Sequence, residues 1–380
     1  MGCGELPDAP QYGDAGSNTL VHTAEAVGGL RLPALARLGL GNIAPIAGVR
    51  AVPRPAASFG KMAERSKGKD STTGHWEIAG LVVEKAFPTF PWGFPAGLME
   101  RFCRAAGVKG YLGNRTASGT AIIAELGEEH VRSGLPIVYT SADSVFQIAA
   151  HEEVIPIARQ YEICAKTRSD VCTGEFAVGR VIARPFVGTA GRFVRTTNRR
   201  DFSLPPHGET VLDLLRRAGV RTTSIGKVDD LFAGRGLDDM HHSKSNEEGI
   251  AEILRLAGGG GGLFFANLGD FDTLYGHRND PQGFAGALER FDAALPGILS
   301  LITDDDLLMI TADHGNDPVS TSTDHSREYV PLLCYAPGRG TGVSLGTRRS
   351  LADVGKTVAD FFGVPNSLAG TSFLSALGSA

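Results

Sequence analysis

Three short polar segments in the second half of the chain combine aspartate with histidine: Asp270–His277, Thr311–Asp317 and Thr323–Glu328. Carboxylate and imidazole together suit Zn²⁺ or Mn²⁺ better than Ca²⁺ or Mg²⁺, which prefer oxygen ligands. Two Asp-plus-His groups and one further histidine predict more than one ion, and paired ions are a common device for phosphoryl chemistry. Any one of these side chains taken alone is equally well interpreted as a turn or helix cap, or as a surface residue.

A fourth segment carries hydroxyl groups. Gly68-Lys69-Asp70 runs into Ser71-Thr72-Thr73-Gly74-His75-Trp76-Glu77. A hydroxyl on a metal ion can lose its proton near neutral pH and attack phosphorus, and a following helix N-terminus would stabilise a phosphate through its free N–H groups. The alternative is a turn in which Ser71 or Thr72 caps a helix. The metal-ligand segments elsewhere in the chain are what favour the chemical interpretation.

Strands and helices must position these segments. Strand-like and helix-like stretches alternate in the second half of the chain, with strands predicted at 221–225, 263–268 and 306–312 and helices at 209–218, 245–257, 281–302 and 351–362. This alternation predicts an α/β fold with a mainly parallel sheet covered on both faces. The runs at 263–268 and 306–312 are apolar enough to predict buried strands. Because ligands bind at the carboxyl ends of parallel strands, the two segments that follow these strands should converge.

Proline-rich stretches flank the middle of the chain, at 87–91 and 203–206. Between them the strands lie further apart and turn residues are denser. This pattern predicts a smaller α/β domain at residues 88–204, inserted into a discontinuous metal-binding core domain formed by 1–87 and 205–380.

Five consecutive glycines at 258–262 require a separate interpretation. A phosphate-binding glycine loop follows a strand and opens a helix. These glycines follow a predicted helix and precede a predicted strand, so we interpret them as a flexible connector.

The composition excludes several classes of protein. Apolar residues make up 42% of the 380 residues, which allows a sizeable core, and the net charge of -5 argues against a nucleic-acid-binding protein. No apolar run reaches the roughly 18 residues of a membrane span, so no membrane partner is expected. The cysteines are five in number and scattered, without the spacing of a zinc or redox motif. Free thiols of this kind are typical of the reducing cytosol and predict a cytoplasmic protein.

Six stretches resemble the signature segments of the phosphopentomutases, a family of the alkaline phosphatase superfamily. In family order they are GKDSTTGHWEIAGL at 68–81, YTSADSVFQIAAHEE at 139–153, GRVIARPFVG at 179–188, FDTLYGHRNDPQG at 271–283, ITADHGNDP at 310–318 and TDHSREYVPLL at 323–333. The resemblance covers nearly the whole chain. It implies an alkaline-phosphatase-like three-layer core interrupted by a cap domain, and interconversion of ribose or deoxyribose 1-phosphate and 5-phosphate through a phosphothreonine.

The same resemblance implies roles for individual residues. Thr73 is the expected nucleophile, one Mn²⁺ ion would be held by Asp272, His277 and His325, and a second by Asp313, His314 and the phosphate on Thr73. Sugar-phosphate contacts are expected from Ser141, Asp143, Val145, Arg180, Ile182, Arg195 and Lys227. The forked guanidinium group of arginine pairs well with phosphate oxygens, which on chemical grounds alone also makes Arg184 a candidate. The alternative for Arg184 is that it is an ordinary solvated charge on the surface. The expected partners are small sugar phosphates, and a sugar bisphosphate is the expected activator. The protein itself is expected to be a monomer.

The start of the chain departs from the family pattern. The family opens with an apolar strand that ends in Asp-Ser, ahead of a Gly-x-Gly stretch that Gly2-Cys3-Gly4 matches. The aspartate, a ligand of the Asp313–His314 ion, would fall two positions before Met1. We therefore expect Met1 to be an internal methionine of a longer chain, and expect activity to be impaired by the missing strand and ligand.

Two other functions stay open at this stage. One is a related metal-dependent phosphatase or mutase; a phosphoglycerate mutase type would be expected to use serine in place of Thr73. The other is an inactive sugar-phosphate binder, because the metal site is expected to be incomplete. The stoichiometry of Mn²⁺ would separate the inactive binder from the enzyme.

Overall fold

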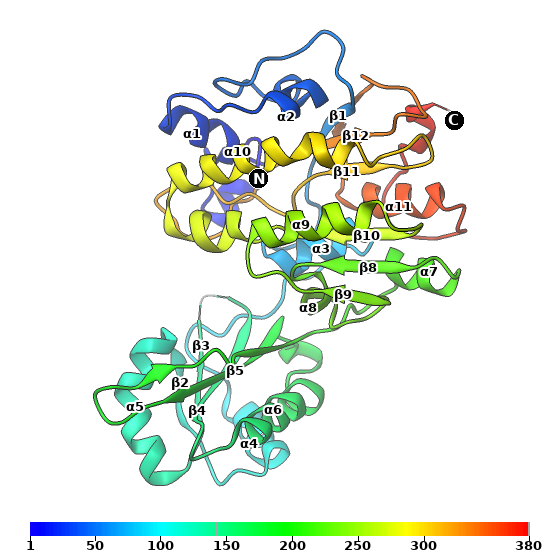
Figure 1. The fold of residues 1–380 in the computed structure, drawn as a ribbon. Coiled ribbons are helices and arrows are strands. Elements are labelled where there is room, and N and C mark those ends of the chain that lie inside the picture. The colour runs from blue at the N-terminus through cyan, green and yellow to red at the C-terminus, as the bar shows by residue number, and fades with distance from the viewer. Residues whose placement is uncertain (142, 379–380) are drawn as a thin grey trace. The chain divides into compact units, whose positions relative to one another are not determined.

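The computed structural model describes residues 1–141 and 143–378 and divides into two compact units. The larger unit joins Met1–Lys85 to Pro206–Ala380, and the smaller unit is Ala86–Pro205. Helices and strands alternate in both units, so the chain has the α/β fold predicted from its sequence (Figure 1). No helix among the described residues is long and apolar enough to cross a membrane.

The strands of the larger unit form two sheets within the described residues. One has the strand order β11-β12-β1-β13 and the other has the order β10-β8-β9. In chain order, the elements of this unit are η1 (Ala9–Tyr12), α1 (Thr19–Ala26), α2 (Pro33–Leu38), η2 (Leu40–Asn42), β1 (Ser58–Met62), α3 (Ser71–Ile78), α7 (Val211–Arg217), β8 (Thr222–Ile225), α8 (Val228–Phe232), β9 (Asp239–His241), α9 (Asn246–Ala257), β10 (Leu263–Ala266), η5 (Phe271–Tyr275), η6 (Gly276–Arg278), α10 (Pro281–Leu299), β11 (Leu308–Ile310), β12 (Val330–Tyr335), β13 (Ser344–Arg348), α11 (Ala352–Phe361) and η7 (Leu374–Leu377).

The two sheets differ in strand direction. β1 pairs antiparallel with β12, with Ser58 opposite Cys334, and parallel with β13. In the other sheet all pairings are parallel, and Ile225 of β8 lies opposite both Ala266 of β10 and His241 of β9. The carboxyl ends of these three strands therefore meet at one edge, where the segment after β10 begins.

The two strands predicted to be buried are only partly covered. β10 and β11 each lie at the edge of their sheet. Phe264 of β10 is 37% exposed, and all three residues of β11 are half-buried. An apolar run does not reveal whether a strand lies in the centre or at the edge of a sheet, and this is why the prediction of burial was wrong.

Helix α10 packs against α1, α2 and α9 (Figure 1). Phe284, Leu288 and Leu295 lie at the helical spacing of an apolar stripe and are buried in the core beneath it. Asp280 caps the first turn by accepting a hydrogen bond from the N–H of Gly283. This packing fixes the start of α10 and with it the preceding turn that carries His277.

Local sequence signals set the helix starts in the second half of the chain. Ser245 caps α9 by accepting a hydrogen bond from the N–H of Glu248, as its residue type predicts. Thr210 and Asp213 form a capping box at the start of α7. The five glycines at 258–262 connect α9 to β10, which confirms their interpretation as a connector.

The smaller unit is an α/β sandwich around a mixed sheet. The strand order is β2-β3-β4-β5-β6, and β7 also pairs with β5. Its elements are α4 (Ala96–Ala106), β2 (Leu112–Thr116), α5 (Gly119–Ser133), β3 (Ile137–Thr140), β4 (Val145–His151), α6 (Ile157–Lys166), η3 (Thr167–Val171), η4 (Gly174–Phe176), β5 (Arg180–Val187), β6 (Val194–Arg195) and β7 (Arg200–Ser203).

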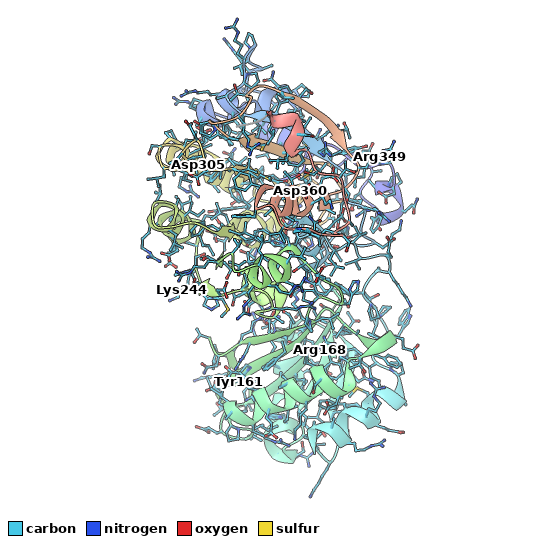
Figure 2. The ribbon with its side chains drawn as sticks, turned by 90° about the vertical axis from the view of Figure 1, so that its right-hand side faces the viewer. Tyr161, Arg168, Lys244, Asp305, Arg349 and Asp360 are labelled. Atoms are coloured by element: carbon cyan, nitrogen blue, oxygen red, sulfur yellow. The ribbon has the colours of Figure 1, made fainter. Side chains whose placement is uncertain are left out.

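Both faces of this sheet are covered, because side chains alternate along the buried strand β4. Phe146 and Ile148 face the cluster that contains α4 and α6, whereas Ala149 faces the cluster that contains α5. On the α6 side, Tyr161 donates a hydrogen bond to the carbonyl of Asn198. Figure 2 labels Tyr161 and Arg168 in this unit.

Candidate functional site

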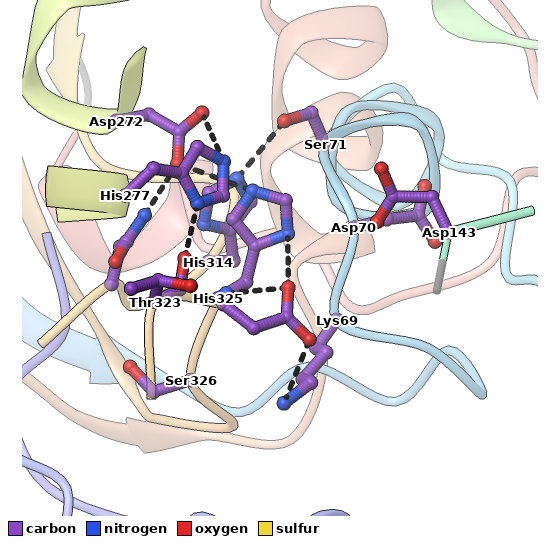
Figure 3. Close-up of polar contacts among 12 residues, drawn as sticks. Lys69, Asp70, Ser71, Asp143, Asp272, His277, His314, Thr323, His325 and Ser326 are labelled. Carbon is purple, nitrogen blue, oxygen red and sulfur yellow. Dashed lines mark hydrogen bonds and ion pairs between the residues drawn. The ribbon is translucent and has the colours of Figure 1, made fainter. Parts of the chain in front are cut away.

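Three loops of the larger unit bring aspartate and histidine together. Asp272 lies in η5, a single π-helical turn after β10, and His277 lies in η6 directly after it. The loop after β11 carries Asp313 and His314, and His325 lies in the loop before β12. Figure 3 shows Asp272 among the rings of His277, His314 and His325. Single π turns of this kind occur frequently at functional sites.

The ligand atoms of Asp272, His314 and His325 lie within 4.8 Å of one another. Asp272 Oδ2 is 3.3 Å from His277 Nε2, and Asp272 Oδ1 is 3.1 Å from His325 Nε2. The ring centroids of His314 and His325 are 4.0 Å apart. Four of the five predicted ligands therefore form one group.

Asp313, the fifth predicted ligand, joins this group through His314. Asp313 Oδ2 is 3.2 Å from His314 Nε2 and 3.1 Å from Nδ1 of His75 on α3. His75 was not among the predicted site residues. Its Nδ1 is also 2.8 Å from the carbonyl oxygen of Ser71. His75 therefore links α3 to the loop that follows β11.

Backbone carbonyl groups orient two of the histidines. His277 Nδ1 is 2.6 Å from the carbonyl oxygen of Thr323, and His314 Nδ1 is 3.0 Å from that of Gly315. A neutral imidazole that donates from Nδ1 keeps a lone pair on Nε2, which is the usual arrangement of a metal-binding histidine. In both residues Nε2 faces an aspartate.

Charge and burial act against each other in this group. Burial alone would raise the pKa of Asp272, but the neighbouring imidazoles of His277 and His325 hold that pKa below the ordinary value. Burial would likewise raise the pKa of Asp313, but His314 and His75 lie beside its carboxylate and hold that pKa well below its usual range. The carboxylate of Asp313 outweighs burial at His314 and raises its pKa to about 9. The site therefore favours two anionic carboxylates and a positive charge between them.

The donor set fits divalent cations. His325 Nε2 is buried and has no hydrogen-bond partner in the described part of the chain, although Asp272 Oδ1 lies 3.1 Å away. A buried nitrogen without a partner costs free energy. A cation held between the imidazole and the carboxylate would satisfy both groups, and mixed nitrogen and oxygen donors suit Mn²⁺ or Zn²⁺.

Helix α3 begins beside this group of ligands. Asp70 is its N-cap, and the Asp70 side chain accepts hydrogen bonds from the N–H groups of Thr72 and Thr73. Ser71 is thus the first residue of the helix and does not cap it. Its Oγ lies 3.0 Å from His314 Nε2 (Figure 3).

The hydroxyl of Thr73, the predicted nucleophile, lies in a different environment. It is fully buried, and its single O–H has two acceptors within reach, the carbonyl oxygen of Asp70 at 2.8 Å and Glu64 Oε1 at 3.3 Å. Within the described residues it makes no hydrogen bond to a predicted metal ligand. The structure therefore places the hydroxyl of Ser71, and not that of Thr73, at hydrogen-bond distance from a predicted ligand.

Comparison with known proteins identifies the family. Residues 59–366 match the model of the Metalloenzyme superfamily. The chain is 57% identical to the phosphopentomutase of Dictyoglomus turgidum over 375 residues, which cover 98% of this chain and 95% of the relative. It is 56% identical to the phosphopentomutase of Caldanaerobacter subterraneus subsp. tengcongensis, with the same coverage. This chain belongs to the phosphopentomutase family.

Phosphopentomutases are isomerases of the intramolecular phosphotransferase class, and the superfamily is one of metal-dependent enzymes. All five predicted metal ligands and Ser71 lie within the matched region 59–366. A solved structure of a Pyrococcus horikoshii protein covers 97% of both chains with a TM-score of 0.50 at 13% identity. This likeness concerns the fold, which is that of the alkaline-phosphatase-like metalloenzymes.

Four of the sugar-phosphate contacts expected of a phosphopentomutase lie at one edge of the smaller unit's sheet. Ser141 follows β3, Val145 begins β4 and Arg180 begins β5, and Val145 and Arg180 are paired in register. Arg180 is 3.9 Å from Asp143 and 3.5 Å from Asp201. A guanidinium at this edge is partly exposed and has carboxylates that orient it.

The other predicted contacts are more scattered. Ile182 is 2% exposed within β5, so its side chain belongs to the core and any contact would come from its backbone. Arg195 is exposed on β6, and Arg184 donates from Nε to Gln147 Oε1 at 3.0 Å. Lys227 is exposed and belongs to the larger unit, at the N-cap of α8.

The residue Asn316, which sequence reasoning did not select, completes the surroundings of Asp272. Its Nδ2 donates to Asp272 Oδ1 at 2.6 Å. A Cβ added to Gly276 would lie 2.4 Å from Asn316 Cγ, so this approach requires glycine. Both residues lie inside the segments that carry the family resemblance, but nothing in their types indicated the contact.

Proposed function

We propose that this chain catalyses the phosphopentomutase reaction, the interconversion of ribose or deoxyribose 1-phosphate and 5-phosphate. One observation carries the proposal: Ser71 Oγ, at the start of α3, lies 3.0 Å from His314 Nε2 inside a group of carboxylates and imidazoles. A hydroxyl beside metal ligands is what nucleophilic phosphoryl transfer needs. The relatives that are 57% identical are phosphopentomutases, which supports the choice of substrate.

The proposed cofactor is Mn²⁺ at two adjoining positions. Asp272, His277 and His325 would hold one ion, and Asp313 and His314 the other. Bound divalent ions polarise phosphoryl oxygens and lower the pKa of a hydroxyl that they contact. The closeness of Asp272, His314 and His325 supports adjoining positions.

Ser71 is the phosphoryl acceptor in this proposal, in place of Thr73. The Thr73 hydroxyl is fully buried against Asp70 and Glu64, which leaves no room for a phosphate without a rearrangement of the first turn of α3. Ser71 is half-buried and faces His314. The intermediate is therefore a phosphoserine, whereas the family resemblance had led us to expect a phosphothreonine.

The reaction then consists of two half-reactions. Phosphorylated Ser71 donates its phosphoryl group to the free hydroxyl of the pentose monophosphate, and the proton of that hydroxyl passes to the Ser71 oxygen. Ser71 next attacks the other phosphate of the bisphosphate, and its proton passes to the departing sugar oxygen. The chain's own residues position the groups and balance charge, which is the main requirement of phosphoryl transfer. A sugar bisphosphate would prime unphosphorylated Ser71.

The smaller unit is proposed to act as a cap that binds the sugar phosphate. Ser141, Asp143, Val145 and Arg180 lie at one edge of its sheet, and the Arg180 fork suits a phosphate. Exclusion of water by a cap would protect the phosphoserine from hydrolysis. Ile182, Arg195 and Lys227 are further proposed contacts, and the family resemblance is what supports them.

A serine acceptor removes the residue-type argument against a phosphoglycerate mutase. The relatives at 57% identity, which are phosphopentomutases, support the phosphopentomutase reaction instead. The test is conversion of ribose 1-phosphate to ribose 5-phosphate with Mn²⁺ and a bisphosphate primer, followed by peptide mapping of the phosphorylated residue. We expect isomerisation and a phosphate on Ser71, which Ser71→Ala abolishes and Thr73→Val retains. Release of inorganic phosphate without isomer would indicate a phosphatase, and binding without turnover would indicate an inactive binder.

A further inference from the structure

Arg327 is a buried arginine whose five N–H groups are all engaged. Nη1 donates to Glu64 Oε2 at 2.8 Å and to the Gly68 carbonyl at 2.7 Å. Nη2 donates to the Glu64 carbonyl at 2.9 Å, and Nη2 and Nε donate to the two oxygens of Asp8 at 3.2 Å each. The side chain is 2% exposed, and Tyr12 covers its face at 4.9 Å. Lysine, with three donors on a point charge, cannot reproduce this arrangement.

The contacts of Arg327 join two parts of the proposed site. Glu64 and Gly68 belong to the loop between β1 and α3, which leads directly into Ser71. Arg327 itself lies two residues after His325. A single guanidinium therefore ties the segment that carries a metal-ligand candidate to the loop that carries the acceptor.

Glu64 extends this connection into the first turn of α3. One of its carboxylate oxygens accepts from Arg327, and the other lies 3.3 Å from Thr73 Oγ1. A Cβ added to Gly68 would lie 3.0 Å from Thr73 Cγ2, which shows how closely the loop packs on this turn. The Thr73 hydroxyl thus connects the first turn of α3 to the loop that carries Glu64.

We propose that Arg327 is a positioning residue for the phosphoryl acceptor, a role that rests on the proposed function. Through Glu64, Gly68 and Thr73 it holds the start of α3 so that Ser71 Oγ remains at His314. None of the described contacts of Arg327 reaches Ser71, so its effect is transmitted by the loop. Misplacement of a reacting group by about 1 Å costs on the order of 100-fold in rate. By holding the loop in place, Arg327 would prevent such a misplacement of Ser71.

The test compares Arg327→Lys with Arg348→Lys. Arg348 is a matched control, because it is 15% exposed in the same unit and pairs with Asp353, a residue outside the proposed site. For Arg327→Lys we expect kcat to fall roughly 10- to 100-fold, with KM and the affinity for Mn²⁺ within about twofold. In the metal-free protein, hydrogen exchange should accelerate at residues 65–74 and stay unchanged at β8. Arg348→Lys should leave kcat and the exchange of residues 65–74 unchanged.

An unchanged kcat in Arg327→Lys, or faster exchange spread evenly over the larger unit, would overturn the positioning role. If Arg327→Lys does not fold, Thr73→Val removes the far end of the connection while it keeps the shape of the side chain. We then expect kcat to fall roughly 3- to 10-fold at constant KM, and no change would again overturn the proposal. If the unsubstituted chain shows no mutase turnover, the proposed function fails, whereas hydrogen exchange in the metal-free variants still decides whether Arg327 and Thr73 hold the loop.

Discussion

Gly74 of α3 lies directly against the backbone of Asp313, so that a Cβ at Gly74 would come within 2.2 Å of the Asp313 carbonyl oxygen. Real Cβ atoms do not approach an oxygen this closely, and Gly74→Ala must push α3 away from the loop after β11. We expect this variant to lose on the order of 100-fold in mutase kcat and about 1–3 kcal/mol of unfolding free energy. Steady-state kinetics and urea unfolding are the measurements.

Gly97→Ala is the matched control for this substitution. Gly97 also lies inside a helix, α4, and a Cβ there meets no atom within 4 Å. Because alanine has the higher helix propensity, we expect Gly97→Ala to be neutral or to stabilise by up to about 1 kcal/mol, with unchanged kcat. Equal losses in the two variants would show that the contact with Asp313 is not what constrains position 74.

Glu77 is a buried carboxylate that holds the far end of α3. It is fully buried and accepts hydrogen bonds from the N–H groups of Arg65, Ser66 and Leu351 and from the hydroxyl of Ser350. Glu77→Gln places an NH₂ group opposite these donors, and we expect a loss of about 1.5–3 kcal/mol in urea unfolding. The exposed Glu84 provides the comparison, because Glu84→Gln should stay within about 0.5 kcal/mol of the natural chain.

Metal binding should stabilise the protein through Asp272. At a Mn²⁺ concentration of 100 times Kd, a site that exists only in the folded state adds about 2.7 kcal/mol of stability, and a chelator should remove this gain together with activity. Asp272→Asn should abolish most of the shift in Tm that Mn²⁺ produces. The exposed Asp305, labelled in Figure 2, serves as control, and Asp305→Asn should respond to Mn²⁺ as the natural chain does. A full shift in Asp272→Asn would remove this residue from the ligand set.

His130 in the smaller unit predicts a dependence of stability on pH. Its Nε2 accepts the N–H of His151 at 2.8 Å and its Nδ1 lies 2.6 Å from the Leu135 carbonyl, so both nitrogens suit the neutral ring. Burial lowers the pKa of His130, the hydrogen bond to Leu135 opposes this, and the neighbouring His151 adds to it. The unfolded chain, with an ordinary histidine pKa of about 6.5, therefore binds this proton more readily than the folded chain.

Stability should consequently fall as pH drops through the unfolded value of about 6.5 towards the lower folded value, and should be fully present above 6.5. The measurement is an NMR titration of the His130 ring, with Tm recorded between pH 5 and pH 8. His130→Gln should show a smaller loss of Tm on acidification than the natural chain. A ring that titrates above 6.5 in the folded protein would contradict the prediction.

The structure brings the metal-ligand candidates together, but the hydroxyl that it places beside them is that of Ser71 and not that of Thr73, the predicted acceptor. Asp272 and His314 are recognisable because they follow apolar strands, and His325 because it stands in a third segment that combines aspartate with histidine. The structure places the ligand atoms of these three residues within 4.8 Å of one another. The choice of Thr73 depended on the family motif alone. Asp70 caps α3, so Ser71 and Thr73 stand two positions apart on the helix, about 200° around its axis. Only one of the two hydroxyls can face His314, and the hydroxyl-rich run does not reveal which.

The fold shows a similar division between local and non-local information. The ends of α7, α9 and α11 lie within two residues of their predicted bounds, because capping residues and apolar periodicity are properties of the local sequence. The pairing of β1 with β12 and β13 joins segments about 270 to 290 residues apart and has no local signal. For the same reason the burial of β10 and β11 was overestimated, since their edge positions depend on strands elsewhere in the chain.

The contact between Ser71 and His314 spans 243 residues of sequence. At ordinary rates of synthesis, about 5–20 residues per second, Ser71 leaves the ribosome roughly 12–50 s before His314 does. During that interval the proposed acceptor exists without the proposed metal ligands and without Arg327, which we propose positions it. The candidate site consequently cannot form before the loop that ends at Arg327 has left the ribosome. Chains released before that point by a stalled ribosome would carry Ser71 but not the histidine that it contacts.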